Sequence, residues 1–151
     1  MRGAPRFEDY PARRETVFPP AVPILSSRDG RMFRTAIQAD ASRGPNFAGH
    51  WTVAEWGCGA GCRDAALVDA RSGAVRFVDG VRDVDGTYVD LRDTAACDML
   101  CFRWDSRLLV VQGAPDEDPR RDGIAFYEWT GRRLRLLRFV PAAELCPGWT
   151  R

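Results

Sequence analysis

The sequence predicts an α+β fold, in which a twisted, mainly antiparallel β-sheet of about seven short strands carries one N-terminal helix and an extended proline-rich arm. Three observations support this prediction: short apolar runs separated by glycine-containing turns, a single segment with helical spacing, and five prolines within the first 28 residues. With 151 residues, 45% of them hydrophobic, the chain has the size of one domain. We therefore expect a domain over residues 29–151 and an arm over residues 1–28.

The arm, residues 1–28, is predicted to be extended because proline at this density excludes a long helix. The N-terminus is polar and charged and lacks the pattern of a signal peptide. Two interpretations stay open: a cytosolic protein, or a mature exported form in which Met1 replaces a removed export signal. The arm carries several apolar side chains, so we expect it to wrap the domain. These side chains are Phe7, Tyr10, Val17, Phe18, Val22 and Ile24.

Residues 29–43 are the one segment with a clear helical pattern. Ser27 or Asp29 can cap its start, and Gly44 with Pro45 ends it. We expect one helix here, with a single apolar face toward the sheet. Its apolar residues are Met32, Phe33, Ala36, Ile37 and Ala41.

After this helix, the apolar pattern becomes that of β-strands. Gly73 and Gly131 stand in short turns between apolar runs, as glycines do in β-hairpins. Residues 113–122 are too charged to be buried and predict a polar loop, and residues 141–145 predict one helical turn. The expected strands are residues 48–56, 64–69, 74–78, 87–91, 100–104, 108–112, 124–129 and 133–140.

The composition argues against nucleic-acid and membrane partners. The formal net charge is +1, and all 22 basic residues are arginines, several of which stand beside acidic residues. This pattern indicates a solvated surface of mixed charge rather than a basic stripe. No apolar run approaches the length of a membrane span. The sequence therefore predicts neither nucleic-acid binding nor a membrane span.

Five cysteines, four of them in two pairs of equal spacing, indicate disulfide bonds and an oxidising compartment. Cys58 and Cys62 flank three small residues that can fold back, so we expect a local bond between them. We expect one further bond among Cys97, Cys101 and Cys146, although a bond from the second pair to the first loop is also possible. A zinc site made by the two spaced pairs is the alternative, but the second pair lacks a glycine-rich knuckle.

The candidate functional region holds the only histidine and comprises His50, Trp51, Glu55 and Trp56. A Cys–His nucleophile would require His50 to lie near Cys58, yet eight residues of extended strand separate the two by about 25 Å. The alternative is a packed histidine that is hydrogen-bonded to a backbone group. We assign no catalytic residue from the sequence.

Acidic residues around two glycines raise the question of a calcium loop: Asp79, Asp83, Asp85 and Asp90. The spacing after Gly86 brings no glutamate to the closing position of an EF-hand. The chain also lacks a Gly-x-Ser-x-Gly elbow, a phosphate-binding loop, a dinucleotide fingerprint and a zinc-protease helix. The sequence predicts no metal and no cofactor.

Several motifs resemble those of a group of small bacterial proteins of unknown function that are usually exported. They are Pro-Asn-Phe-Ala-Gly-His-Trp at 45–51, Trp-Gly-Cys-Gly-x-x-Cys at 56–62, a hydrophobic-Asp-x-x-x-Gly hairpin at 68–73 and Asp-Ser-Arg-Leu-Leu at 105–109. Residues 7–11 also resemble the segment that follows the export signal in such proteins. The resemblance covers most of the chain. It implies export and a Cys58–Cys62 bond, and it implies no activity.

The sequence thus favours an exported, disulfide-stabilised binding module over an enzyme, with an inhibitor or an immunity-type protein as specific forms. We expect the partner to be another protein and the location to be the periplasm or the cell exterior. Trp104, Trp129 and Trp149 are candidate interface anchors if they are exposed, and core residues otherwise. The competing hypothesis is an enzyme or metal site built from His50, Glu55, Cys58 and Cys62.

Overall fold

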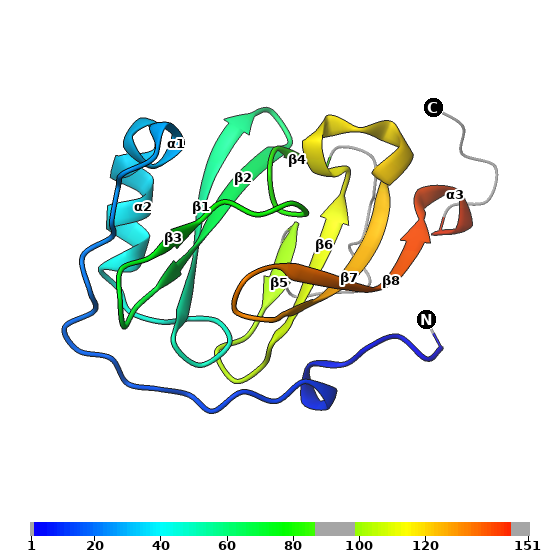
Figure 1. Ribbon diagram of the computed structural model, residues 1–151. Coiled ribbons are helices and arrows are strands. Elements are labelled where there is room, and N and C mark those ends of the chain that lie inside the picture. Colours follow the sequence, from blue (N-terminus) through cyan, green and yellow to red (C-terminus); the bar gives the residue numbers. More distant parts are fainter. Residues whose placement is uncertain (1, 87–98, 146–151) are drawn as a thin grey trace.

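The computed structural model describes residues 2–86 and 99–145 and shows two antiparallel sheets with a few short helices (Figure 1). In the first sheet, β2 lies between β1 and β3, and the short β4 pairs with the other end of β2. The strands of this sheet are β1 (Trp51–Gly59), β2 (Cys62–Asp69), β3 (Val75–Arg76) and β4 (Val84–Asp85).

The second sheet is a meander, because each strand pairs with the next one along the chain. Its last hairpin contains a bulge beside Tyr127, where the register of β7 on β8 shifts by one residue. The strands are β5 (Leu100–Phe102), β6 (Leu108–Gly113), β7 (Gly123–Trp129) and β8 (Leu134–Pro141).

The prediction of an α+β fold with one sheet and one N-terminal helix is wrong. The described chain is mainly β, its strands are divided between two sheets, and the longest helix has eight residues. The predicted helix is interrupted at Phe33, whose backbone leaves helical geometry (φ −104°, ψ 21°) while its ring stacks on Trp56. The helical elements are η1 (Phe7–Asp9), α1 (Arg28–Met32), α2 (Arg34–Ala41), η2 (Pro115–Glu117), η3 (Pro119–Arg121) and α3 (Ala142–Leu145).

The main core lies between the two sheets. Trp51 and Leu67 from the first sheet meet Leu109, Val111 and Trp129 from the second in one buried cluster. The outer faces are covered as well: α2 packs on β1 and β2, and the start of the arm packs on β6 and β7. Because both faces of β1 and β2 are buried, their apolar residues form continuous runs rather than a strict alternation.

The strand predictions place most of the observed strands within a few residues. The first strand begins at Trp51 instead of residue 48 because residues 47–51 form a tight turn, in which Phe47 and Trp51 exchange backbone hydrogen bonds. The sequence did not indicate β4, whose two residues stand in an acidic, glycine-containing stretch typical of a turn. The predicted strand 87–91 lies outside the described residues.

The arm follows the edge of the domain through backbone hydrogen bonds (Figure 1). The amide of Ala21 donates to Ala70 O (2.8 Å), and the amide of Ile24 donates to Gly73 O (2.8 Å). Gly73 is required at this contact, because its φ is +82° and a Cβ there would collide with the carbonyl oxygen of Val22. In the described part of the chain, no helix is long and apolar enough to cross a membrane.

Candidate functional site

The candidate residues of the sequence lie along β1 and do not converge on one site. Trp51 is 6% exposed and packs edge-on against Trp129 in the core, with ring centroids 4.9 Å apart. Trp56 lies on the other face of the strand and stacks on Phe33. The backbone amide of Glu55 donates to the Asp40 carboxylate (2.9 Å), which ties β1 to α2. These residues therefore join the strand to its neighbours.

His50 precedes β1, and its Nδ1 lies 2.8 Å from the Asp69 carboxylate. The partner is thus a side-chain carboxylate and not the backbone group considered from the sequence. Asp69 also accepts the Arg71 amide (2.9 Å) and so closes the β2–β3 turn. Burial acts to raise the pKa of Asp69, but the Arg71 amide and the His50 ring together lower it below its ordinary value. The carboxylate is held ionised by its partners.

The end of the molecule around His50 brings together segments that are far apart in sequence, and we call it the clasp: residues 7–11, 45–51, 69 and 104–106. The buried Ser106 hydroxyl lies 2.8 Å from Phe7 O and 3.0 Å from Tyr10 O. Gly49 exchanges hydrogen bonds with Trp104, because its amide donates to the Trp104 carbonyl and its carbonyl accepts from Trp104 Nε1. Segments of the motifs named in the sequence analysis, residues 7–11, 45–51 and 105–106, therefore meet in the clasp, where they have a structural role.

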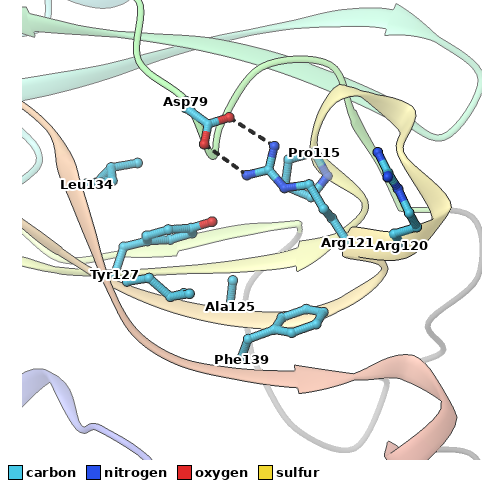
Figure 2. A pocket seen from close by; sticks show the side chains of 9 residues that line it. Asp79, Pro115, Arg120, Arg121, Ala125, Tyr127, Leu134 and Phe139 are labelled. Carbon is cyan, nitrogen blue, oxygen red and sulfur yellow. Dashed lines mark hydrogen bonds and ion pairs between the residues drawn. The ribbon is translucent and has the colours of Figure 1, made fainter.

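A pocket of about 350 Å³ opens beside β7 and β8 (Figure 2). Its floor is apolar, whereas its rim carries Asp79, Arg120 and Arg121. Arg121 donates to both oxygens of Asp79 (2.9 and 3.1 Å), so an ion pair borders the cavity above the Tyr127 ring. Burial raises the pKa of the Tyr127 hydroxyl. The apolar lining consists of Pro115, Ala125, Tyr127, Leu134, Leu136 and Phe139.

This pocket leaves no signal in the sequence, because its rim joins residues 42 positions apart. The prediction that residues 113–122 form an exposed polar loop holds only for the middle of the segment, because Gly113 ends β6 and Ala114, Pro115 and Asp122 are buried. Nothing in the pattern indicated that Arg121 would meet Asp79. Gly80 packs directly on Tyr127, since a Cβ at this position would lie 3.1 Å from the ring. The loop after β3 therefore forms one wall of the pocket.

The tryptophan anchors expected from the sequence are not exposed in the described part of the chain. Trp129 is 2% exposed because β7 turns this side chain into the core between the sheets. Trp104 is half-buried and is held by its bond to Gly49, and Trp149 lies outside the described residues.

Large apolar side chains are instead exposed on the arm. Phe18 is 89% exposed, Val22 77% and Ile24 56%, and we call these three residues the arm ridge. A groove of about 450 Å³ runs between this part of the arm and α2. Met32, at the end of α1, is also exposed.

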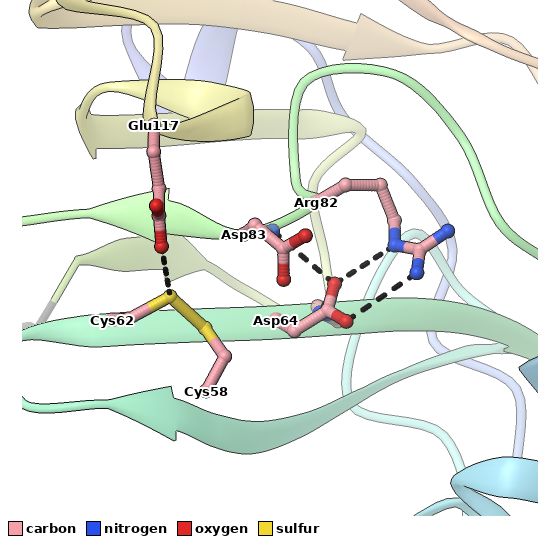
Figure 3. The surroundings of a disulfide bond; sticks show 7 residues. Cys58, Cys62, Asp64, Arg82, Asp83 and Glu117 are labelled. Atoms are coloured by element: carbon pink, nitrogen blue, oxygen red, sulfur yellow. Dashed lines mark hydrogen bonds and ion pairs between the residues drawn. A yellow bond between two sulfur atoms is a disulfide. The ribbon is translucent and has the colours of Figure 1, made fainter.

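The other end of the β1–β2 hairpin carries the Cys58–Cys62 disulfide, which confirms the predicted local bond (Figure 3). Cys58 is exposed and Cys62 is buried, with Glu117 Oε1 3.7 Å from its sulfur. Cys101 is also disulfide-bonded. The other cysteines of the predicted second bond, Cys97 and Cys146, lie outside the described residues.

A buried ion pair lies beside this disulfide. Asp64 is 1% exposed and accepts hydrogen bonds from Arg82 Nε (2.8 Å) and from the amides of Ala65 and Asp83. Burial acts to lower the pKa of Arg82, but the hydrogen bonds and negative charges of Asp64 and Asp29 together outweigh this effect and raise it. Burial and the nearby Asp64 charge raise the pKa of Asp83. Asp64 thus lies between the Arg82 guanidinium, which binds it, and Asp83, whose amide donates to it (Figure 3).

Backbone strain is concentrated at the same place. Asp83 (φ 46°), Asp116 (φ 58°) and Glu117 (φ 54°) are three of the four non-glycine residues with positive φ in the described chain. They are joined to one another, because the Glu117 amide donates to Asp83 O (3.1 Å) and the Asp116 amide donates to Arg82 O (2.9 Å). Left-handed residues of this kind cluster at functional sites, where the surroundings hold them in place.

Comparison with known proteins found no match to this chain among protein-family models, curated proteins or solved structures. Inferences about function therefore rest on the residues and their geometry.

Proposed function

We propose that this protein is an exported, disulfide-stabilised binding module that docks on another protein through the arm ridge. The observation that carries the proposal is the exposure of Phe18, Val22 and Ile24 within seven residues of one segment. Single exposed apolar residues are ordinary, but three large ones so close together in one segment favour a protein contact.

The ridge is held in a defined position, which favours binding. Two backbone hydrogen bonds fix it to the β2–β3 turn, and three prolines (Pro19, Pro20 and Pro23) restrict its backbone. A segment that is ordered before binding loses little conformational entropy when a partner covers it. The ridge thus resembles a preformed apolar edge more than a loose tail.

The geometry gives the competing enzyme hypothesis little support. The His50–Asp69 pair and the Cys58–Cys62 bond lie at opposite ends of β1, and the two sulfurs are bonded to each other rather than available as nucleophiles. Export is supported by the disulfide, since such bonds persist in oxidising compartments, and by the resemblance of the motifs to exported proteins.

The test identifies the partner by photo-crosslinking from the ridge and then measures affinity. A photoreactive residue at position 18 or 22 should capture one partner, whereas the same residue at the exposed position 132 should not. With the purified partner, Phe18→Ser should weaken binding at least tenfold, and the matched change Met32→Ser should leave it unchanged. Equal affinity of Phe18→Ser and the unmodified chain would exclude docking through the ridge.

Export is tested separately by counting thiols in the denatured protein isolated from its natural compartment. One free thiol is expected for two disulfides among five cysteines. Five free thiols would place the protein in a reducing compartment and overturn this part of the proposal.

A second candidate function, capture of a small apolar ligand, is favoured by the pocket beside Tyr127. Its volume lies within the range of small-molecule sites, and its apolar floor adjoins a polar rim. Titration with phenylpropionate and with its amide, followed by NMR, should shift signals of Tyr127 and Phe139 in a saturable way. Filling the cavity with Ala125→Leu should abolish these shifts. Signal shifts that do not saturate, or that persist in the Ala125→Leu variant, would exclude the pocket as a ligand site.

A further inference from the structure

We propose that reduction of the Cys58–Cys62 disulfide opens a Zn²⁺ site whose four ligands are the two thiolates and the carboxylates of Asp83 and Glu117. This inference does not depend on the proposed partner of the arm ridge, because it concerns the opposite end of β1 and β2.

The donor atoms are already gathered at this place. The two sulfurs and a carboxylate oxygen of Asp83 all lie within 4.8 Å of one another. Glu117 Oε1 lies 3.7 Å from Cys62 Sγ. In a tetrahedral zinc site with Zn–S near 2.3 Å and Zn–O of 2.0–2.2 Å, neighbouring ligand atoms are about 3.4–3.8 Å apart. While they are bonded to each other the two sulfurs are too close for such a site, and reduction removes that constraint.

Three segments hold these ligands in place without a metal ion. Antiparallel pairing of Cys62 with Asp85 brings β4, and therefore Asp83, beside the tip of the hairpin. The Glu117 amide donates to Asp83 O, so η2 is fixed to the same segment. Figure 3 shows Glu117 and Asp83 approaching the disulfide from two different elements. A site preformed in this way needs little rearrangement to bind an ion.

The left-handed backbone of Asp83 and Glu117 adds to this argument. Aspartate tolerates a positive φ, but glutamate rarely adopts one, and Gly or Asn would do so with less strain at position 117. The strain at Glu117 therefore accompanies a side chain that reaches the Cys62 sulfur.

The chemistry requires a reductant, for which we specify a dithiol. The dithiol transfers two electrons and two protons to the protein, the S–S bond breaks to give two thiols, and the reagent becomes a disulfide. Zn²⁺ then displaces the two thiol protons and binds both thiolates. Cys58 is exposed, so a reagent can reach it. In the oxidised protein the sulfurs carry no thiolate charge, and the site is closed.

The experiment compares metal binding by the full-length chain in its two redox states. The protein is reduced with a dithiol, freed of the reagent under inert gas, and titrated with Co²⁺, whose thiolate complexes show charge-transfer absorption. The reduced chain should bind one Co²⁺ with this absorption, and added Zn²⁺ should displace it. The oxidised chain should show no such absorption, and equal binding by both forms would overturn the proposal.

Variants assign the ligands. Asp83→Asn and Glu117→Gln should each weaken Co²⁺ binding about tenfold or more. The loss of a residue that only hydrogen-bonds a metal ligand already lowers metal affinity by this factor. Asp118→Asn is the matched control, since this nearby carboxylate instead binds Arg120. Affinity unchanged in both Asp83→Asn and Glu117→Gln would contradict the assignment.

A second measurement uses the unmodified chain and so does not depend on how the variants fold. Zn²⁺ is added to the reduced protein before alkylation, and the modified cysteines are mapped by mass spectrometry. Compared with the metal-free reduced protein, Zn²⁺ should slow the alkylation of Cys58 and Cys62 and leave the rates at the other cysteines unchanged, since Cys62 and Cys101 are already shielded by burial. Protection of other cysteines instead, or protection of none, would overturn the proposal.

Discussion

The two ends of β1 and β2 are stabilised in different ways. At the clasp, hydrogen bonds join segments that are distant in sequence: Ser106 and Phe7 are 99 positions apart. At the other end, the covalent bond and the buried ion pair are local, with sequence separations of 4 for Cys58–Cys62 and 18 for Asp64–Arg82, and η2 joins them from Glu117, 55 positions beyond Cys62. A sequence stretch with many rare residues, 45–62, is therefore not one site. A single strand divides it between two structural environments.

The largest effect is expected at the disulfide end from Asp64→Ala. The change leaves Arg82 without its buried partner and should lower the free energy of unfolding by about 3 kcal/mol. Urea denaturation measures this loss. Asp79→Asn breaks the more exposed ion pair between Asp79 and Arg121, and it should lower the free energy of unfolding by less than about 1 kcal/mol. Similar losses for both variants would show that the buried pair has no special role.

A smaller effect is expected when the covalent bond at the same end is removed. The double change Cys58→Ser with Cys62→Ser should lower the free energy of unfolding by about 2 kcal/mol, because the bond closes only a short loop of the unfolded chain. The attachment of the arm at the clasp should not change. A tryptic cleavage rate at Arg13 and Arg14 above that of the unmodified chain would show that the two ends are coupled.

Ser106→Ala should weaken the clasp by about 1.5 kcal/mol, because it leaves the amide of Leu108 and two carbonyls of the arm without their shared partner. Tryptic cleavage at Arg13 and Arg14 should then become about tenfold faster, since 1.4 kcal/mol corresponds to a factor of ten in opening. Ser42→Ala, which removes an exposed helix-end hydrogen bond, is the control. A cleavage rate that does not change would mean that other contacts hold the arm.

The smallest effect is expected from Asp69→Asn, which should lower the free energy of unfolding by about 1 kcal/mol at neutral pH. The folded pKa of Asp69 is lowered, so its contribution is complete above the unfolded value of about 3.9 and is lost as the pH falls through the folded value. The difference between the unmodified and variant proteins should therefore disappear in acid. A difference that stays constant down to low pH would contradict this account.

The sequence predicted local features better than their assembly. Turn glycines such as Gly73 and the short apolar runs between them located most strands, and the small residues between Cys58 and Cys62 indicated their bond. The division into two sheets was not predictable, because a pattern of period two does not state which strands pair. The helix prediction failed where Phe33 stacks on Trp56, a contact between residues that share no local pattern.

The candidate site was predictable only in part for a similar reason. His50 was recognisable as the only histidine, but its partner Asp69 lies across the hairpin in the next turn. The strained carboxylates of Asp83 and Glu117 come from two loops whose acidic composition is that of any exposed turn. Their meeting depends on the pairing of β4 with β2, and that two-residue strand left no signal in the sequence.

The clasp also constrains the order in which segments of the chain can dock during folding. A ribosome releases residues 7–11 long before it releases Ser106, which binds their carbonyls. This earlier segment is therefore among the last to dock, since contacts between distant positions form slowly. Until that moment the outer face of β6 and β7 lacks its cover of Phe7 and Tyr10. A chain that covers this apolar face only at the end of folding leaves it open to other contacts until then.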